Sequence, residues 1–397
     1  MNQVNKRVIL ILLAALNFTH ILDFMVMMPL GNYLMPHFKI SPREFSYLVS
    51  AYTLSAAGSG FLAAFFVDRY DRKKLLLFAY LGFLVGTFFC GIAPSFEALL
   101  LARLVAGIFG GMIGAQVLSI VADIFPYEER GKAMGAVMSA FSVASTLGIP
   151  FSLYIANLLS WHAPFLFIAT LGLVIVPLLY RYIPPMGSHL QNNQHKGRPF
   201  LAFQSLVADK RQLMALLFSL LWYMGHFLII PFINPMLEFN MGFSKLQTPM
   251  IYLVGGVVSF LAANYFGKLS DKLGKLKIFS ICMVITLAFV LVITHLPAFP
   301  FYIVLLFFAG WFIFSTGRGV TAQALLSNVA PIQQRGSFMS FNSSIQSLGT
   351  GLASFIAGVL VTADAKGKLS GYSDLGWMSI TMLGGSLVLA RYIFRQR

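Results

Sequence analysis

The sequence predicts an all-α membrane protein with twelve transmembrane helices in two pseudo-symmetric six-helix bundles. The first observation is composition: of the 397 residues, 58% are hydrophobic and only 10% are charged, and the mean hydropathy is +0.79. A soluble domain of this size could not bury so much apolar surface, so the lipid bilayer must be its solvent. The other two observations are the grouping of the apolar residues into twelve runs and the recurrence of sequence elements in the two halves.

Each apolar run is about 20 residues long, which is enough for a helix to cross a hydrocarbon core of about 30 Å. The runs cover residues 8–30, 47–67, 75–93, 97–120, 133–158, 161–183, 211–237, 248–267, 278–296, 300–322, 337–362 and 374–394. A polar segment near 184–210 separates six runs from the other six and is interpreted as a flexible linker. We therefore expect an N-terminal bundle over residues 1–183, a cytoplasmic linker over 184–210 and a C-terminal bundle over 211–397.

The net charge of +15 is explained by topology. If both chain ends are cytoplasmic, 21 of the 28 Lys and Arg residues lie in cytoplasmic segments and only five lie in outer loops. This is the positive-inside asymmetry, and it predicts that both termini are cytoplasmic. The basic residues then favour contact with anionic lipid headgroups and do not indicate a nucleic-acid partner. We expect a multi-pass protein of a bacterial cytoplasmic (inner) membrane.

Two loop sequences recur about 205 residues apart. Residues 126–131 (PYEERG) recur as 331–336 (PIQQRG), and residues 68–74 (DRYDRKK) recur more loosely as 271–277 (DKLGKLK). A duplicated membrane chain with basic loops in equivalent places is typical of a secondary transporter built from parallel repeats.

The first span of each half carries the same spacing of two residues. His20 and Pro29 are nine positions apart, as are His226 and Pro235. The offsets between the halves differ by only a few residues, so one register with small insertions relates the two halves. The repeat therefore extends from the loops into the predicted spans.

The loop after the second span resembles a signature of the major facilitator superfamily, and more narrowly of its twelve-span drug:proton antiporters. That signature has the form Gly-x-x-x-Asp-Arg-x-Gly-Arg-[Arg/Lys]. Residues 64–73 (AFFVDRYDRK) keep its acid and its three bases but replace both glycines, whereas residues 267–275 (GKLSDKLGK) keep both glycines. The resemblance implies the superfamily fold, alternating access and proton-coupled export.

The charges of these loops are expected to form a gate on the cytoplasmic side. A carboxylate at a helix end can accept hydrogen bonds from neighbouring helix N-termini or pair with an arginine of the next loop. Such contacts would hold the cytoplasmic side closed and would break when the bundles rock apart. The alternative is that the charges only anchor the loops at the headgroups. The expected gate residues are Asp68, Arg69, Arg72, Arg130, Asp271 and Arg335.

Asp23 is the only acidic residue well inside a predicted span, which makes it a functional candidate. At a rise of about 1.5 Å per residue, Asp23 lies roughly 22 Å above the cytoplasmic boundary and Arg103 lies roughly 9 Å below the outer boundary. These depths coincide in a core of about 30 Å, so we expect the two side chains to pair. Arg103 also lies in a segment that resembles the family's fourth span, where an arginine is tied to proton coupling.

We expect Asp23 to take up and release the coupling proton, with Arg103 and His20 assisting. His20 precedes Asp23 by three residues and shares its helix face. The alternatives are a permanent structural ion pair between Asp23 and Arg103, and a structural role for the histidine. Sodium in place of the proton also stays open.

Polar and aromatic residues of the central spans are expected to line the substrate cavity. The seventh span is interrupted at Pro231 and Pro235, and broken helices mark site-lining elements in transporters. Aromatic and methionine side chains suit a large, weakly polar or cationic compound, although lipid or core contact is the alternative for each of them. The expected cavity residues are Asn17, Phe24, Met28, Tyr223, His226, Asn234, Trp311 and Gln346.

Arg318 is the second basic residue inside a predicted span. It lies about 18 residues into the tenth span, roughly 27 Å from the outer boundary, which places its backbone near the cytoplasmic headgroups. We expect its side chain to snorkel to that interface or to join the gate, and not to bind substrate.

The leading hypothesis is a proton-coupled exporter of small lipophilic or drug-like compounds. The alternative is an uptake symporter, or an exporter, specific for one metabolite such as a sugar, an amino acid or a siderophore. The sequence has no metal-ligand spacing, no Gly-rich phosphate loop and no Walker sequence, which argues against an enzyme, a cofactor or ATP-driven transport. The expected partners are a small-molecule substrate, protons and the lipid bilayer, and we expect a monomer.

Overall fold

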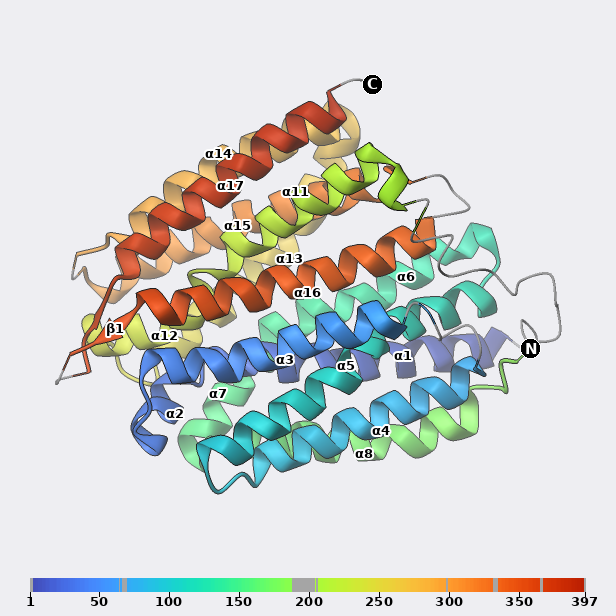
Figure 1. The fold of residues 1–397 in the computed structure, drawn as a ribbon, viewed down its shortest axis with the longest axis horizontal. Coiled ribbons are helices and arrows are strands. Elements are labelled where there is room, and N and C mark those ends of the chain that lie inside the picture. The colour runs from blue at the N-terminus through green and yellow to red at the C-terminus, as the bar shows by residue number, and fades with distance from the viewer. Residues whose placement is uncertain are drawn as a thin grey trace.

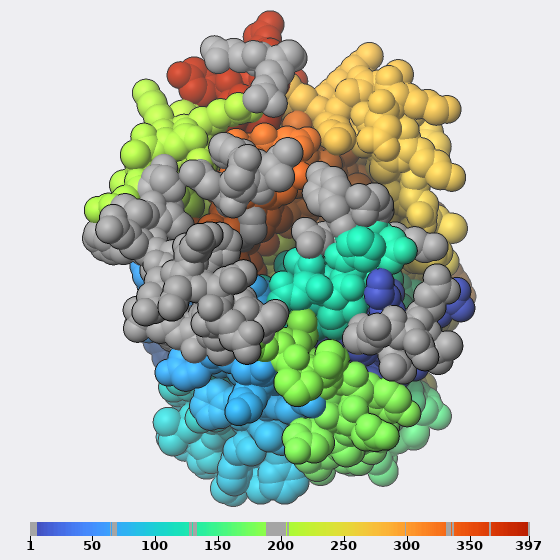
Figure 2. Space-filling model, turned by 90° about the vertical axis from the view of Figure 1, so that its right-hand side faces the viewer, coloured from blue at the N-terminus to red at the C-terminus, as the bar shows by residue number. Residues whose placement is uncertain are grey.

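A computed structural model describes residues 3–63, 65, 70–187, 204, 206–297, 299–330, 335–364 and 367–395. Long helices dominate it and run roughly along the long axis of the molecule (Figure 1). Both chain ends lie at the same end of the helices (Figure 1). Figure 2 looks onto that end: the N-terminal helices fill its lower part and the C-terminal helices its upper part. The two parts of the chain therefore lie beside each other, each spanning the length of the molecule.

Two of the N-terminal helices begin at a residue whose side chain caps the helix. The Asp71 carboxylate accepts the N–H of Lys74 at the start of the third long helix, and the Ser95 hydroxyl accepts the N–H of Ala98 at the start of the fourth. The elements are α1 (Gln3–Met27), α2 (Gly31–Phe38), α3 (Pro42–Ala63), α4 (Arg72–Gly91), α5 (Phe96–Ile124), α6 (Tyr127–Val143), η2 (Ala144–Gly148), α7 (Ile149–Leu158) and α8 (Ala163–Tyr182).

The C-terminal helices follow the same order, except that their first span is broken. Pro231 and Pro235 each lack a backbone donor, and the chain passes there through short 3₁₀, α and π turns. The elements are α11 (Lys210–Phe227), η4 (Ile230–Phe232), α12 (Ile233–Pro235), η5 (Met236–Asn240), α13 (Thr248–Leu273), α14 (Lys275–Thr294), α15 (Phe301–Leu326), α16 (Arg335–Leu360), β1 (Thr362–Ala363), β2 (Leu369–Ser370) and α17 (Tyr372–Phe394). The strands β1 and β2 form a small antiparallel hairpin.

Eleven helices in the described part of the chain are long and apolar enough to cross a membrane, by length and composition. They correspond to eleven of the twelve predicted spans. The twelfth, predicted over 47–67, corresponds to α3, which carries several hydroxyl side chains such as Ser50, Thr53 and Ser55. These hydroxyls bond to carbonyls of their own helix, so α3 is a long helix of the bundle despite its more polar composition.

The N-terminal and C-terminal helices pack closely where α3 lies beside α16 (Figure 1). Tyr47 stacks on Phe355 at 5.8 Å between ring centroids, and a Cβ added to Gly358 would lie 2.0 Å from the Ser46 hydroxyl oxygen. A glycine is therefore required for this approach of the two helices, as is usual where membrane helices pack closely.

The outer surface of the helices is rich in large apolar side chains. Leu101 is 63% exposed, Val174 59%, Leu306 73% and Val388 68%. These residues come from four different helices, α5, α8, α15 and α17. Apolar side chains in such numbers on the outside fit a protein whose solvent is lipid.

Candidate functional site

The predicted pairing of Asp23 and Arg103 is present at the meeting point of α1 and α5. Arg103 Nη1 donates to Asp23 Oδ2 at 2.7 Å, and both side chains are fully buried. The guanidinium also lies over the Tyr52 ring of α3, 4.3 Å from its centroid. Because each charge is balanced by the other, the pair can persist where an isolated charge could not.

His20 lies one turn before Asp23 and packs against α5. Its ring centroid lies 5.5 Å from that of Phe83 and 6.4 Å from that of Tyr52. The contact requires Gly110, since a Cβ there would lie 3.1 Å from His20 Nε2 and 2.8 Å from the Tyr52 hydroxyl. His20 Nδ1 and that hydroxyl are buried without a hydrogen-bond partner in the described residues. The surroundings of the ion pair therefore have unused hydrogen-bonding capacity.

The expectation that Arg318 snorkels to the headgroups is wrong. Its side chain is only 1% exposed, and Arg318 Nη2 lies 3.0 Å from His226 Nδ1 across α15 and α11. Arg318 Nη1 is 3.8 Å from the sulfur of Met283. Counting residues gives the height of a Cα only, whereas a helical side chain leans toward the N-terminus of its helix, here back toward the outer side. The guanidinium consequently reaches His226 in the interior.

Four predicted cavity residues form one aromatic cluster with Phe227. The rings of His226 and Trp311 stack at 5.4 Å between centroids, and those of Tyr223 and Phe227 stack at 5.8 Å. Phe24 of α1 lies 5.9 Å from Phe227 of α11, so the cluster joins the N-terminal and C-terminal helices. Phe24, Tyr223 and His226 are only partly buried.

The remaining predicted cavity residues lie apart from this cluster or make helix contacts. Asn17 donates to the Val137 carbonyl of α6 at 3.2 Å. Asn234 donates to the carbonyl of Pro29 at 2.9 Å, which ties the broken first span of the C-terminal helices to the end of α1. Met28 is 2% exposed and Gln346 is 9% exposed, and the amide nitrogen of Gln346 has no partner in the described residues.

The described part of the N-terminal gate centres on Arg72. Asp68, Arg69 and the side chain of Arg130 lie outside the described residues. Arg72 Nε lies 2.9 Å from Asp123 Oδ2, which links the start of α4 to the end of α5. Asp123 was not among the expected gate residues, although its position immediately before the repeated loop 126–131 was a signal for it.

The C-terminal copy of this contact has no charge pair in the part of the chain that the structure describes. Arg335 Nη2 donates to the Asn328 side-chain oxygen at 3.3 Å, and Asn328 occupies the place of Asp123 about 205 residues later. Asp271 is exposed and takes part in none of the ion pairs among the described residues. The C-terminal half therefore has an amide at the position where the N-terminal half has the acid that contacts Arg72.

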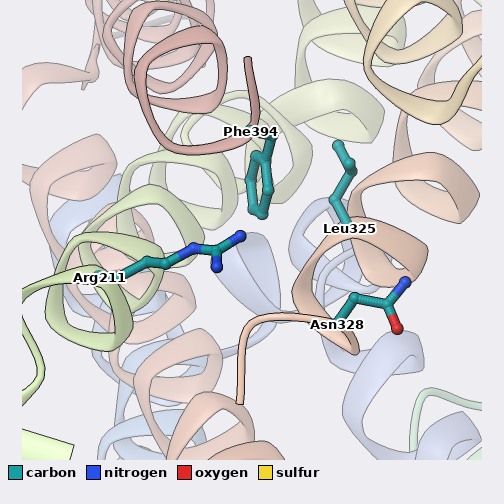
Figure 3. Close-up of a pocket in the computed structure, with 4 residues that line it drawn as sticks. All are labelled: Arg211, Leu325, Asn328 and Phe394. Carbon is teal, nitrogen blue, oxygen red and sulfur yellow. The ribbon is translucent and has the colours of Figure 1, made fainter. Parts of the chain in front are cut away.

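An open recess of about 170 Å³ lies at the ends of three C-terminal helices and is lined by Arg211, Leu325, Asn328 and Phe394. Figure 3 shows these side chains, which come from α11, α15, the turn after α15, and α17. Arg211 precedes His226 by fifteen residues, roughly 22 Å along a helix. The recess is thus separate from the Arg318–His226 contact.

His37 of α2 and His162, in the turn before α8, lie near each other. His162 stacks on Trp161 at 3.7 Å between ring centroids and lies 6.1 Å from the ring of His37. Partial burial, together with the proximity of His37, lowers the pKa of His162 below its ordinary value. Protonation of this loop is therefore disfavoured in the folded protein.

Within the described ranges, no group of three or more His, Cys, Asp or Glu side chains is placed to hold a metal ion. Cys90 and Cys282 are both buried and unbridged. The chemistry that the described interior offers consists of hydrogen bonds, charges and aromatic contacts.

A family model described as Major Facilitator Superfamily matches residues 13–354 and 265–394. The chain belongs to the Major Facilitator Superfamily. Membership identifies it as a secondary transporter embedded in a membrane by several spans, and it argues against an enzyme.

Curated relatives and solved structures agree with this assignment. A Bacillus subtilis (strain 168) protein named uncharacterized MFS-type transporter YceJ is 28% identical over 362 residues, 89% of this chain and 89% of the relative. Multidrug resistance protein 3 of the same organism is 28% identical over 164 residues, 41% of this chain and 32% of the relative. The crystal structure of a D-xylose-proton symporter superposes with a TM-score of 0.77 at 15% identity, covering 99% of this chain and 98% of that one; this likeness shows the shared fold.

Proposed function

We propose that the protein is a proton-coupled exporter of small lipophilic or drug-like compounds in a bacterial cytoplasmic membrane. The observation that carries the proposal is the buried Asp23–Arg103 pair, with His20 on the same face of α1. Membership of the superfamily supports secondary transport. Among the described residues, Asp23 is the only acid whose side chain is fully buried, which makes it the candidate for binding the coupling proton.

Proton binding and ion pairing compete for the same carboxylate. A proton on Asp23 would neutralise it and would leave Arg103 as a buried charge without a counter-ion, which is costly. The protonated state therefore favours an arrangement in which Arg103 finds water or another partner. Rocking of the two bundles, 1–183 and 211–397, about the linker 184–210 would supply such an arrangement. His20 and the Tyr52 hydroxyl, which have unused hydrogen-bonding capacity, would pass the proton between Asp23 and water.

The gate assignment is part of the same proposal. Asp68, Arg69, Arg72 and Arg130 in one half, and Asp271 and Arg335 in the other, would hold the cytoplasmic side closed and release it during rocking. The Arg72–Asp123 contact supports a role for these loops in joining helix ends. We further propose that both termini are cytoplasmic, which the positive-inside asymmetry supports, and that the protein acts as a monomer.

The aromatic cluster supports a largely apolar substrate. Phe24, Tyr223, Phe227 and Trp311 offer broad apolar surfaces where the two halves meet. The name of the relative Multidrug resistance protein 3 favours drug-like compounds. The structural likeness to a D-xylose-proton symporter favours the second candidate function, a proton-coupled carrier for one metabolite.

The test uses the purified protein in liposomes with an imposed pH gradient and a panel of lipophilic compounds and metabolites. Asp23→Asn should abolish transport driven by the pH gradient and should retain exchange of substrate down its own gradient. Asp374→Asn is the matched control, because Asp374 is an exposed acid at the start of α17. Full pH-driven transport by a folded Asp23→Asn protein would remove Asp23 from the mechanism. A single saturable metabolite, with no transport of the other compounds, would favour the second function.

A further inference from the structure

Arg318 is a second fully buried arginine and has no acidic partner in the part of the chain that the structure describes. Its side chain is 1% exposed, and none of the ion pairs among the described residues includes it. Its polar neighbours are the neutral sulfur of Met283 and the ring of His226. A guanidinium stays protonated in proteins, so this part of the interior carries an uncompensated positive charge.

Several hydrogen-bond donors near Arg318 have no acceptor among the described residues. A guanidinium cannot accept a hydrogen bond, so His226 Nδ1 must be the acceptor and the proton of the neutral ring sits on Nε2. Arg318 Nε and the indole nitrogens of Trp222 and Trp311 are buried without an acceptor in the described residues. Trp311 stacks on His226, and a Cβ on Gly319, the residue after Arg318, would lie 3.7 Å from the ring of Trp222.

Arg103 shows that unpaired nitrogens alone do not define such a site. Two nitrogens of Arg103 also lack acceptors, but its charge is balanced by Asp23 at 2.7 Å. Around Arg318, by contrast, the charge has no counter-ion among the described residues, and Arg318 Nε and two indole N–H groups have no acceptor there. An unpaired charge in a membrane interior is costly and marks a functional position. A ligand that complements this site would be a compact hydrogen-bond acceptor with one negative charge.

We propose that Arg318 binds a carboxylate of the transported compound, so that the substrates are lipophilic weak acids in their ionised form. This inference rests on the proposed function, whose substrate class it narrows. The bidentate geometry of a guanidinium matches a carboxylate, and the indole N–H groups and His226 Nε2–H are available as further donors. Tyr223, which is partly buried, and Phe227 provide apolar surface next to this charge for the body of the substrate.

The first experiment measures binding by tryptophan fluorescence in the full-length protein. The chain has four tryptophans, so Trp161→Phe and Trp377→Phe together leave only Trp222 and Trp311, which lie beside the proposed site. The probes are two matched pairs that differ in charge and little in shape: cyclohexanecarboxylate with cyclohexanecarboxamide, and octanoate with octanamide. We expect the carboxylates to bind about 10- to 100-fold more tightly than the amides at neutral pH, as for hydrogen bonds to a charged group.

Variants of Arg318 then test the residue. Arg318→Gln should remove the preference for the carboxylate and leave amide binding unchanged, whereas Arg318→Lys should retain part of the preference. Arg211→Gln, at the recess of Figure 3, is the control and should change neither. Equal weakening of acid and amide in Arg318→Gln would indicate a structural role and overturn the proposal. If that variant does not fold, the parent protein still decides, because equal affinity for acids and amides excludes the site.

Sodium chloride distinguishes an organic carboxylate from an inorganic ion. Arg318 would hold an inorganic anion, and the proposal would be wrong, if two results are found together. Chloride would bind as tightly as the carboxylates and displace them, and the amides would bind as tightly as the acids. These measurements need no pH gradient, so their failure is distinct from failure of proton coupling. If the protein transports amides under a pH gradient but binds acids no more tightly than amides, the proposed function stands and this inference is wrong.

Discussion

Each half of the molecule buries an arginine between an equivalent pair of helices, but only one of the two arginines has a counter-ion among the described residues. In the N-terminal half, Arg103 of α5 meets Asp23 of α1 at 2.7 Å. In the C-terminal half, Arg318 of α15 meets the neutral His226 of α11 at 3.0 Å. The first and fourth spans of each half thus meet in a polar contact. The charge of the arginine is balanced by an acid only in the N-terminal contact.

This difference does not come from the duplication itself. His20 and His226 occupy equivalent positions, but the two arginines do not, because Arg318 follows Arg103 by 215 residues and the repeat is about 205 residues long. Aligned on the histidines, Asp23 corresponds to Ile229. One scaffold thus holds an Asp–Arg ion pair in one half and, in the other, an arginine with no acidic partner among the described residues. Under our proposals the first would bind the proton and the second an anion.

The largest expected effect is the loss of stability when the Asp23–Arg103 ion pair is broken. Asp23→Asn leaves Arg103 buried without its counter-charge and should lower the free energy of unfolding by about 3–5 kcal/mol. Arg103→Gln should have a similar effect, whereas the double variant should lose less than the sum of the two. Thermal unfolding of the purified protein measures all three. Additive losses in the double variant would show that the two side chains are not coupled.

A carboxylate built into the C-terminal half should make it resemble the N-terminal half. His226→Glu places an acid beside Arg318 and should weaken binding of octanoate roughly tenfold, because the protein's own carboxylate competes for the guanidinium. His226→Gln keeps an N–H donor and lacks the charge, so it should weaken octanoate binding much less than His226→Glu does. Tryptophan fluorescence in the background described above reads both. Equal loss in both variants would contradict competition by charge.

Removal of the Arg318 charge should change the stability of the protein little. Arg318→Gln takes an uncompensated charge out of the interior and should change the free energy of unfolding by less than about 1 kcal/mol, in contrast to Arg103→Gln. The midpoint of thermal unfolding in the absence of substrate measures it. A loss as large as that of Arg103→Gln would mean that Arg318 is compensated after all.

The smallest effect concerns the loop histidine His162. Its pKa is lowered in the folded protein, so below about pH 6.5 the unfolded chain binds a proton more readily than the folded one. Acidification from pH 7 to pH 5 therefore destabilises the protein through this residue, and His162→Gln should make unfolding less dependent on pH. His295→Gln, at the end of α14, is the control. An unchanged pH dependence in His162→Gln would contradict this assignment.

Much of the fold could be predicted because it depends on local composition. Apolar runs of about 20 residues mark helices wherever they occur, and α3 was recognised by its length although it is more polar. The Asp23–Arg103 pair could be predicted from the depths of the two residues, given by the rise per residue of a helix, together with the resemblance to the family. The same count failed for Arg318, because a long side chain reaches several ångströms away from its own Cα.

The sequence by itself determined the number of helices, their duplication, the basic loops and the presence of charges at membrane depth. Apart from the Asp23–Arg103 pair, only the tertiary structure decided which of these charges are paired. Pairing depends on which face of each helix meets its neighbour, and packing of the helices against one another sets that face. The Arg72–Asp123 contact and the isolation of Arg318 from any described acid are both outcomes of this packing. Asp23 and Arg103 could be matched from their depths and the family resemblance, whereas the lack of a described acid beside Arg318 became visible only in the folded molecule.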